Sequence, residues 1–250
     1  MSLSIRALEA GRLVGLHKPS ITYMRGWGKT HVSPMIMFVI DGGAAPIIVD
    51  TGPPDIDRVL RYHNYTLEQS PQERPPAVLK KAGIDPEQVP IVVNTHLHWD
   101  HCSNNSLFPR ADIYVQRKEL EYAANPLQWH NAPFEKHPDI EPPWRTVESQ
   151  LKVADGDTRI APGVSLVALP GHTPGSQGVL VETDGGRYLI AGDCVDTYEN
   201  WDGDAAASHI PSGLYTSLFE YDASFRKIES LGCRVIPSHD EAVVKQGHFQ

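Results

Sequence analysis

The chain has 250 residues, of which 40% are hydrophobic and 21% are charged, and this composition can bury the core of one large α/β domain. The formal net charge of -9 disfavours a nucleic-acid partner, because phosphate binding requires clustered Lys and Arg side chains. Three cysteines without a C-x-x-C pair, no recognisable signal peptide and no apolar run of bilayer length lead us to expect a cytoplasmic protein without membrane contact.

The first third of the chain predicts short strands joined by turns. Apolar runs separated by glycine-containing turns indicate four strands, at residues 5–8, 13–16, 35–40 and 47–49. The aromatic and glycine-rich segment 23–29 fits a hairpin end and a substrate-facing lip equally well. Helices are expected over residues 55–62 and 76–81, and Gly83 is expected to end the second one.

A strand predicted at residues 91–93 ends in a cluster of side chains that can bind a metal. The sequence of residues 91–101 is IVVNTHLHWDH, an apolar β-branched run followed by an H-x-H-x-D-H motif. Alternate side chains of an extended segment share a face, so His96, His98 and Asp100 can converge while His101 serves a neighbouring point. Histidines of a solvated loop are the alternative. A metal site is favoured because the motif directly follows a buried strand, where several imidazoles would otherwise need hydrogen-bond partners.

A long irregular segment follows the strand predicted at residues 111–116 and the helix predicted at 117–124. Residues 125–150 contain five prolines and several aromatics, without the period of a helix or a strand. Irregular segments of this length in compact domains are often functional, so we expect a lid or pocket wall within a single domain of residues 1–250. A surface excursion held by its own aromatic side chains is the alternative.

Three strands predicted in the second half of the chain also end in polar side chains. His172 follows the strand at 164–169 within P-G-H-T-P-G, where glycines and prolines indicate a tight turn. Asp193 follows the strand at 187–190, which forms a hairpin with 177–183. His239 follows the last core strand, at 233–236, after an amphipathic helix over 222–231. The alternation of strands and helices in two halves favours two mixed sheets flanked by helices.

The H-x-H-x-D-H motif and these three later positions resemble the metallo-β-lactamase superfamily of metal-dependent hydrolases. The resemblance implies an α/β fold, the four-layer αββα sandwich of two mixed β-sheets. It also implies seven metal ligands in two groups joined by one carboxylate: His96, His98 and His172 on one ion, Asp100, His101 and His239 on the other, and Asp193 between them.

The resemblance further implies a supporting role for Asp50, at the end of the strand predicted at 47–49. A carboxylate there is expected to accept the second ring N–H of His96 and so to orient that ring toward a metal. Capping of the following turn is the alternative for Asp50.

Five imidazoles and two carboxylates without a thiolate suit two divalent metal ions, with Zn2+ expected first and Fe, Mn or Co as alternatives. Two such ions would turn a shared water into a metal-bridging hydroxide that attacks a carbonyl. Asp100 is a candidate catalytic residue as well as a ligand, because it can pass a proton to the leaving alkoxide. The sequence contains no G-x-S-x-G motif, which argues against a serine hydrolase.

The chain length, the pair Asp100 and His101, and the sequence VQR at 115–117 are similar to the N-acyl homoserine lactonase group, whose members act in quorum quenching. These lactonases carry a tyrosine three residues after the bridging Asp, where this chain has Asp196. Tyr198 and His209 are therefore candidate catalytic residues that would replace the missing hydrogen-bond donor.

We accordingly predict a hydrolase that opens a lactone or a related ester and binds only a small-molecule substrate. A glyoxalase II-like thioesterase is the alternative within the hydrolases. A mononuclear iron dioxygenase of the same superfamily is a more distant one, and a binding protein without catalysis is disfavoured by the complete ligand set. The sequence leaves the oligomeric state open, a homodimer included.

Overall fold

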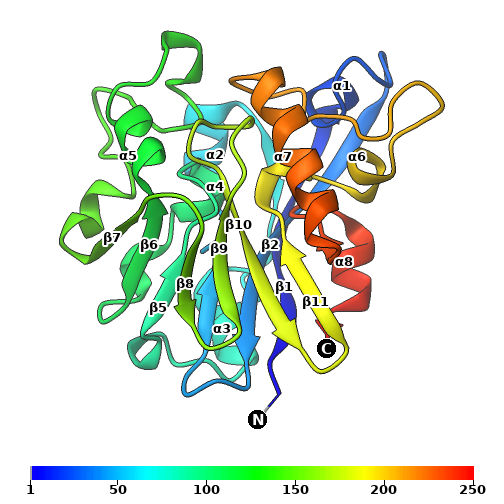
Figure 1. The fold of residues 1–250 in the computed structure, drawn as a ribbon. Coiled ribbons are helices and arrows are strands. Elements are labelled where there is room, and N and C mark those ends of the chain that lie inside the picture. Colours follow the sequence, from blue (N-terminus) through cyan, green and yellow to red (C-terminus); the bar gives the residue numbers. More distant parts are fainter. Residues whose placement is uncertain (1) are drawn as a thin grey trace.

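The computed structural model describes residues 2–250 and contains two β-sheets that face each other (Figure 1). The larger sheet has the order β13-β1-β2-β3-β5-β6-β7, with β4 beside β1. Its strands are β1 (Ser4–His17), β2 (Thr30–Asp41), β3 (Ile47–Val49), β4 (Thr66–Glu68), β5 (Ile91–Val93), β6 (Asp112–Gln116), β7 (Leu151–Ala154) and β13 (His248–Phe249). The smaller sheet has the order β12-β11-β10-β9-β8. Its strands are β8 (Thr158–Ala161), β9 (Val164–Ala168), β10 (Gln177–Thr183), β11 (Gly186–Ile190) and β12 (Arg234–Ile236).

Helices cover the outer side of each sheet and its upper edge (Figure 1). The α-helices are α1 (Lys18–Ile21), α2 (Ile56–His63), α3 (Pro75–Lys81), α4 (Trp99–Cys102), α5 (Arg117–Ala124), α6 (Tyr198–Asp202), α7 (Leu218–Leu231) and α8 (Glu241–Gln246). Short 3-10 helices are η1 (Pro86–Gln88), η2 (Asn105–Leu107), η3 (Gln128–His130), η4 (Arg145–Gln150) and η5 (Gly192–Cys194). Within residues 2–250, none of these helices combines the length and the apolar composition needed to cross a membrane.

The central strand β2 shows why the layers form. All residues from Met35 to Ile40 are buried, because successive side chains of a strand point to opposite faces and both faces are covered. Phe38 and its alternate neighbours pack between the two sheets, against Leu166 and Val179 of the smaller sheet. Met37 and Val39 instead pack on the other side.

Two further apolar layers lie outside the sheets. Side chains of α3 and the following turn, such as Leu79 and Ile84, cover the outer face of the larger sheet. Tyr221 and Phe225 of α7 cover the outer face of the smaller sheet, against Leu189. These layers confirm the predicted four-layer αββα sandwich of two mixed sheets.

Strand direction brings several loops to one edge of the sandwich. In the larger sheet β3, β5, β6 and β7 are parallel. In the smaller sheet β11 pairs in parallel with β12, and the two antiparallel pairings through β10 give β9 the same direction. The carboxyl ends of the parallel strands of each sheet therefore meet at a common edge, where each strand is followed by a loop.

The N-terminal strand differs from the prediction of two separate strands. β1 runs without interruption from Ser4 to His17, and its pairing with β2 shifts register between Glu9 and Arg12. Gly11 lies at this shift with a φ of +104°, so the glycine absorbs a bulge where the sequence indicated a turn. The short strands β4, β7, β8 and β13 and the helix α8 were not predicted.

The segment 125–150 is irregular, as predicted, and is fixed to α2 by one buried carboxylate. Glu135 is fully buried and has a φ of +51°. Its two oxygens accept hydrogen bonds from Arg58 Nε (2.8 Å) and Nη2 (2.5 Å), and His63 Nε2 lies 3.2 Å from Oε1. The pKa of Glu135 is lowered because His63 and Arg58 outweigh the effect of its burial.

Replacing Arg58 by Met is expected to destabilise the fold, because the substitution leaves the buried Glu135 carboxylate without its bidentate partner. The loss of one partner of a buried ion pair costs about 3 kcal/mol of unfolding free energy. Urea unfolding of the two proteins measures the difference. Arg61→Met is the matched control, since Arg61 lies on the same helix and pairs with the exposed Asp139 at 3.4 Å. Equal losses in the two variants would contradict a structural role for the buried pair.

Candidate metal centre

Two loops, one from each sheet, bring three imidazole rings together. His96 and His98 follow β5, and His172 lies in the tight turn after β9. Nδ1 of His98 lies 3.0 Å from Nε2 of His172, and the His96 ring is in edge contact with both. All three rings are buried. We call His96, His98 and His172 the first group.

A second group consists of Asp100, His101 and His239. His101 and His239 are buried, whereas Asp100 is partly exposed. Oδ2 of Asp100 lies 3.6 Å from His101 Nε2 and 3.8 Å from His239 Nε2. In each group, one ligand atom from every residue lies within 4.8 Å of the corresponding atoms of the others, a spacing that a shared metal ion can bridge.

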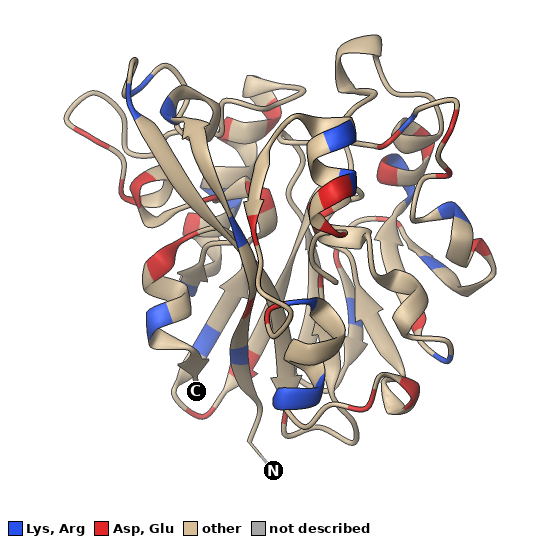
Figure 2. Cartoon of the chain, turned by 180° about the vertical axis from the view of Figure 1, so that it is seen from behind, with Lys and Arg blue, Asp and Glu red and all other residues tan. Residues whose placement is uncertain are grey.

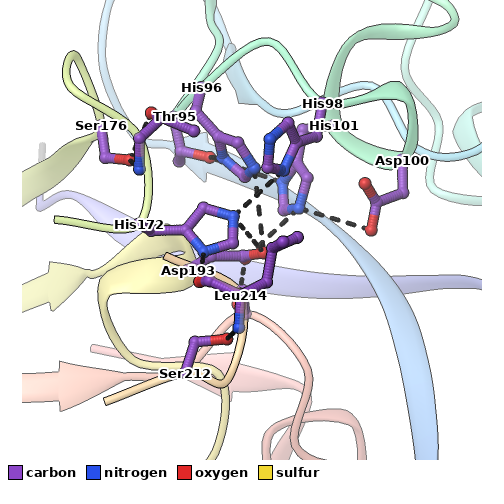
Figure 3. Close-up of polar contacts among 12 residues, drawn as sticks. Thr95, His96, His98, Asp100, His101, His172, Ser176, Asp193, Ser212 and Leu214 are labelled. Carbon is purple, nitrogen blue, oxygen red and sulfur yellow. Dashed lines mark hydrogen bonds and ion pairs between the residues drawn. The ribbon is translucent and has the colours of Figure 1, made fainter. Parts of the chain in front are cut away.

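Asp193, in the short helix η5 after β11, lies between the two groups. Its Oδ2 faces the first group, 3.4 Å from His172 Nε2 and 3.8 Å from His96 Nε2. Its Oδ1 faces the second group, 3.3 Å from His101 Nε2 and 3.2 Å from His239 Nε2. Figure 3 shows the rings of His96, His98, His101 and His172 gathered around this carboxylate, with Asp100 to one side. The structure therefore brings all seven residues predicted as ligands to one place.

Most of the rings are held by a partner at the nitrogen that points away from the centre. His172 Nδ1 lies 2.8 Å from the Leu214 carbonyl and His239 Nδ1 lies 2.9 Å from the Pro34 carbonyl. A carbonyl can only accept, so both rings carry a proton on Nδ1, and Nε2 is the nitrogen that faces the cluster. Neither carbonyl was predicted as part of the site.

Asp50 supports a different ring from the one predicted. Its Oδ2 lies 2.8 Å from Nδ1 of His101, and the same oxygen accepts from the Thr95 hydroxyl at 2.8 Å. His96 Nδ1 instead lies 3.2 Å from Thr95 Oγ1, so Asp50 reaches His96 only through that hydroxyl. The expectation that Asp50 binds His96 is thus corrected to His101. The backbone of Asp50 is in the left-handed region, with a φ of +58°, which turns its carboxylate back toward the motif.

The inner nitrogens have the environment of metal ligands. Nε2 of His96 and Nε2 of His101 are buried, and neither has a hydrogen-bond partner among residues 2–250. Buried polar atoms without partners are costly, and a cation at this point would satisfy both. Imidazole and carboxylate donors of this kind suit Zn2+ and other first-row divalent ions. The residues present therefore fit a bound metal.

The two groups differ in charge. Burial, followed by the neighbouring imidazoles, lowers the pKa of His96 and of His98 well below the ordinary value, so the first group is neutral. Burial also lowers the pKa of His101, but Asp193 and Asp100 outweigh it and raise that pKa well above the ordinary value. In the same way Asp193 outweighs burial and raises the pKa of His239 to about 9. Unless a cation is bound, Asp193 thus favours the protonated form of both rings, and a cation held by the second group would replace the proton on each Nε2.

A cavity of about 240 Å³ opens beside the cluster. Its walls are largely apolar, with Leu13, Leu16, Ile21 and Met35 among the lining residues, and none of the described residues that line it is Lys or Arg. Asp196 also lines the cavity and is buried, with no hydrogen-bond partner for its Oδ1 in the described part of the chain.

The structure does not bring Tyr198 or His209 to this cavity. Tyr198 packs beside the core between the sheets, and its ring is not among the residues that line the cavity. His209 stacks on Trp201 at 4.2 Å between ring centroids, and its two nitrogens face the Trp201 carbonyl and the Glu229 carboxylate. Helix α6 turns the chain after Asp196 away from the metal cluster, which spacing in the sequence could not show.

Known proteins resemble the chain in both sequence and fold. The profile of the Metallo-beta-lactamase superfamily matches residues 36–239. An N-acyl homoserine lactonase from a Bacillus species is 30% identical over 196 residues, which cover 74% of this chain and 73% of that protein. An N-acyl homoserine lactonase from Bacillus cereus is 27% identical over 263 residues, which cover 93% of this chain and 96% of that protein.

A solved structure shows the same fold. It is an N-acyl homoserine lactone hydrolase with the product N-hexanoyl-L-homoserine bound at its catalytic metal center, and it covers 98% of this chain and 97% of its own. Its TM-score is 0.79 at 23% sequence identity. The predicted resemblance is confirmed, and so is the expectation of an enzyme of the hydrolase class, since the curated relatives are lactonases. The chain belongs to the metallo-beta-lactamase superfamily.

Proposed function

We propose that the chain is a dinuclear metal-dependent hydrolase that opens a neutral lactone, of the N-acyl homoserine lactone type or a close relative. The observation that carries the proposal is the position of Asp193, whose two oxygens face two different groups of buried metal-binding side chains. The relatives named as N-acyl homoserine lactonases support the reaction class.

In this proposal the first group would hold one cation, the second group would hold the other, and each oxygen of Asp193 would serve one of them. Zn2+ is the proposed ion, because the donors are five imidazoles and two carboxylates. When bound, the two cations would supply an activated water and polarise the ester carbonyl. Complete second-group ligands favour two cations over the single iron of a dioxygenase.

Asp100 is the proposed proton carrier of the reaction. Its carboxylate belongs to the second group, yet its side chain is 14% exposed and lines the cavity. It therefore lies within reach of both the cluster and a bound substrate. Opening a lactone adds water across the ring C–O bond, and the leaving alkoxide must receive a proton, which a carboxyl group at this place can deliver.

The cavity favours a neutral substrate with an apolar substituent. Leu13, Ile21 and Met35 offer apolar contact, and Trp99 and Leu214 extend it. A thioester of glutathione carries carboxylates that normally require Arg or Lys partners, and the described lining residues include neither. These observations favour a lactone over the thioester alternative.

Residues 125–150 are proposed as a fixed wall of this cavity within a single domain. Ala132 and Pro133 line the cavity, and the Pro133 carbonyl accepts a hydrogen bond from the Trp99 N–H at 3.0 Å. The Phe134 ring is in edge contact with the His98 ring at 4.7 Å between centroids. Together with the buried Glu135, these contacts favour a wall over a mobile lid.

Removal of the metal is expected to abolish lactone opening and to lower the Tm, because an ion that binds only the folded state stabilises it. Chelator-treated protein should regain both properties when Zn2+ is added back, and elemental analysis should find two ions per chain. Lactone opening that survives complete metal removal would refute metal catalysis. Full activity with one ion per chain would refute the dinuclear form.

A substrate panel tests the proposed specificity. With metal-loaded protein, initial rates on N-acyl homoserine lactones should exceed those on a glutathione thioester and on a β-lactam by at least about tenfold in kcat/KM, a difference of roughly 1.4 kcal/mol in transition-state binding. A higher kcat/KM on the thioester would favour the glyoxalase II-like alternative instead.

A further inference from the structure

A buried carboxylate outside the predicted ligand set joins the two loops that carry the first group. Glu119, in α5, is fully buried. Its Oε1 accepts from the Leu97 N–H at 2.9 Å, and its Oε2 accepts from the Thr173 hydroxyl at 2.6 Å and the Gly175 N–H at 3.1 Å. One side chain thus binds a loop of the larger sheet and a loop of the smaller sheet at the same time.

The three donors lie directly beside the ligands of the first group. Leu97 separates His96 from His98, and Thr173 follows His172. Fixing the Leu97 amide restricts the backbone on both sides of it, and fixing Thr173 and Gly175 restricts the turn that presents His172. Glu119 is therefore placed to set the distance between the two loops.

Close packing also fixes the distance between this turn and helix α5. A Cβ added at Gly175 would lie 2.1 Å from the backbone nitrogen of Glu119 and 2.5 Å from its Cα, so only glycine lets the turn approach α5 this closely. The Thr173 hydroxyl is itself fixed by Ser176 Oγ at 2.7 Å. The contact between helix and turn has little freedom to slide.

Other roles for Glu119 have less support. The side chain is not among the described residues that line the cavity, so it does not reach a substrate there. No salt bridge to Glu119 is present among residues 2–250, and its charge is balanced by neutral donors alone. Burial raises the pKa of Glu119 to about 7, against the effect of these donors. A buried carboxyl group is costly unless it is hydrogen-bonded, and the donors that satisfy Glu119 lie in the two loops that carry the first group.

We infer that Glu119 is a positioning residue for the first group, which holds His96 and His98 against His172 so that one cation can bind all three. The inference rests on the proposed metal function. Asp50 has the corresponding position for the second group, where it contacts His101 directly. The two carboxylates then support different cations, and a change at one of them should affect mainly its own site.

The test compares Glu119→Gln with Glu121→Gln in chelator competition for Zn2+ and in the Tm of metal-free protein. Gln keeps one acceptor oxygen for Leu97 but turns an NH2 group toward the Gly175 N–H. Loss of an outer-shell carboxylate typically weakens metal binding by roughly 10–100-fold, so one of the two Zn2+ ions should weaken by this factor while the other keeps its affinity. Glu121 is exposed on the same helix, and its variant should keep both affinities.

Asp50→Asn extends the test, because it should weaken the other ion. Thr173→Val removes a single donor to Glu119 and replaces Glu119→Gln in the test if that variant does not fold. It should weaken binding of the same ion by a smaller factor. Unchanged affinities, or equal loss at both sites, in the Glu119 and Thr173 variants would overturn the inference. Wild-type protein that binds no Zn2+ would instead reject the proposed function on which the inference rests.

Discussion

Five imidazole rings can bind cations in one small buried volume only if each can turn a lone pair, and not an N–H group, toward an ion. Outer acceptors fix this orientation. The carbonyls of Pro34 and Leu214 take the Nδ1 protons of His239 and His172. His98 is the exception, since its Nδ1 faces the cluster and its ring is held by contact with other rings. The geometry of the site is thus set by hydrogen bonds that face away from it.

These outer contacts tie the site to the fold as a whole. Pro34 lies in β2, the central strand of the larger sheet, whereas His239 follows β12 at the edge of the smaller sheet. The hydrogen bond between them crosses the sandwich, beside the apolar layer that includes Phe38 and Leu166. The first group is likewise joined across the sheets, through Glu119. Packing of the two sheets and assembly of the ligands are therefore one event, because neither sheet carries a complete group by itself.

The sequence predicted the side chains that face into the site, and it missed the partners that hold them from outside. The inward side chains carry a residue-type signal: strand spacing put His96 and His98 together, and His172 and Asp193 each ended a predicted strand. The partners on the outside carry little or no such signal. A backbone carbonyl has no residue type, and Glu119 looks like any acidic residue near the start of a helix. Asp50 was assigned to His96 because only the structure shows that Thr95 lies between them.

Irregular segments of the chain were the other part of the structure that the sequence did not predict. Tyr198 and His209 were chosen for their chemistry and their closeness in sequence to Asp196, but α6 has a capping box at Thr197 and directs the chain away from the cavity. The bulge at Gly11 was read as a turn because a glycine between two apolar runs indicates either. Figure 2 shows the positions of Lys and Arg interspersed along the chain with those of Asp and Glu, which outnumber them.

The charges of the site are arranged so that few of them oppose one another. His101 and His239 outweigh burial and lower the pKa of Asp193 well below the ordinary value, so this carboxylate is ionised. Asp196 is also buried only three residues away, and burial together with Asp193 raises its pKa well above the ordinary value, which favours its protonated form. Two carboxyl groups in one wall thus differ in pKa, because the imidazoles outweigh burial at Asp193 but not at Asp196. The difference places the ionised carboxylate at the base of the cavity, between the two groups of metal-binding side chains.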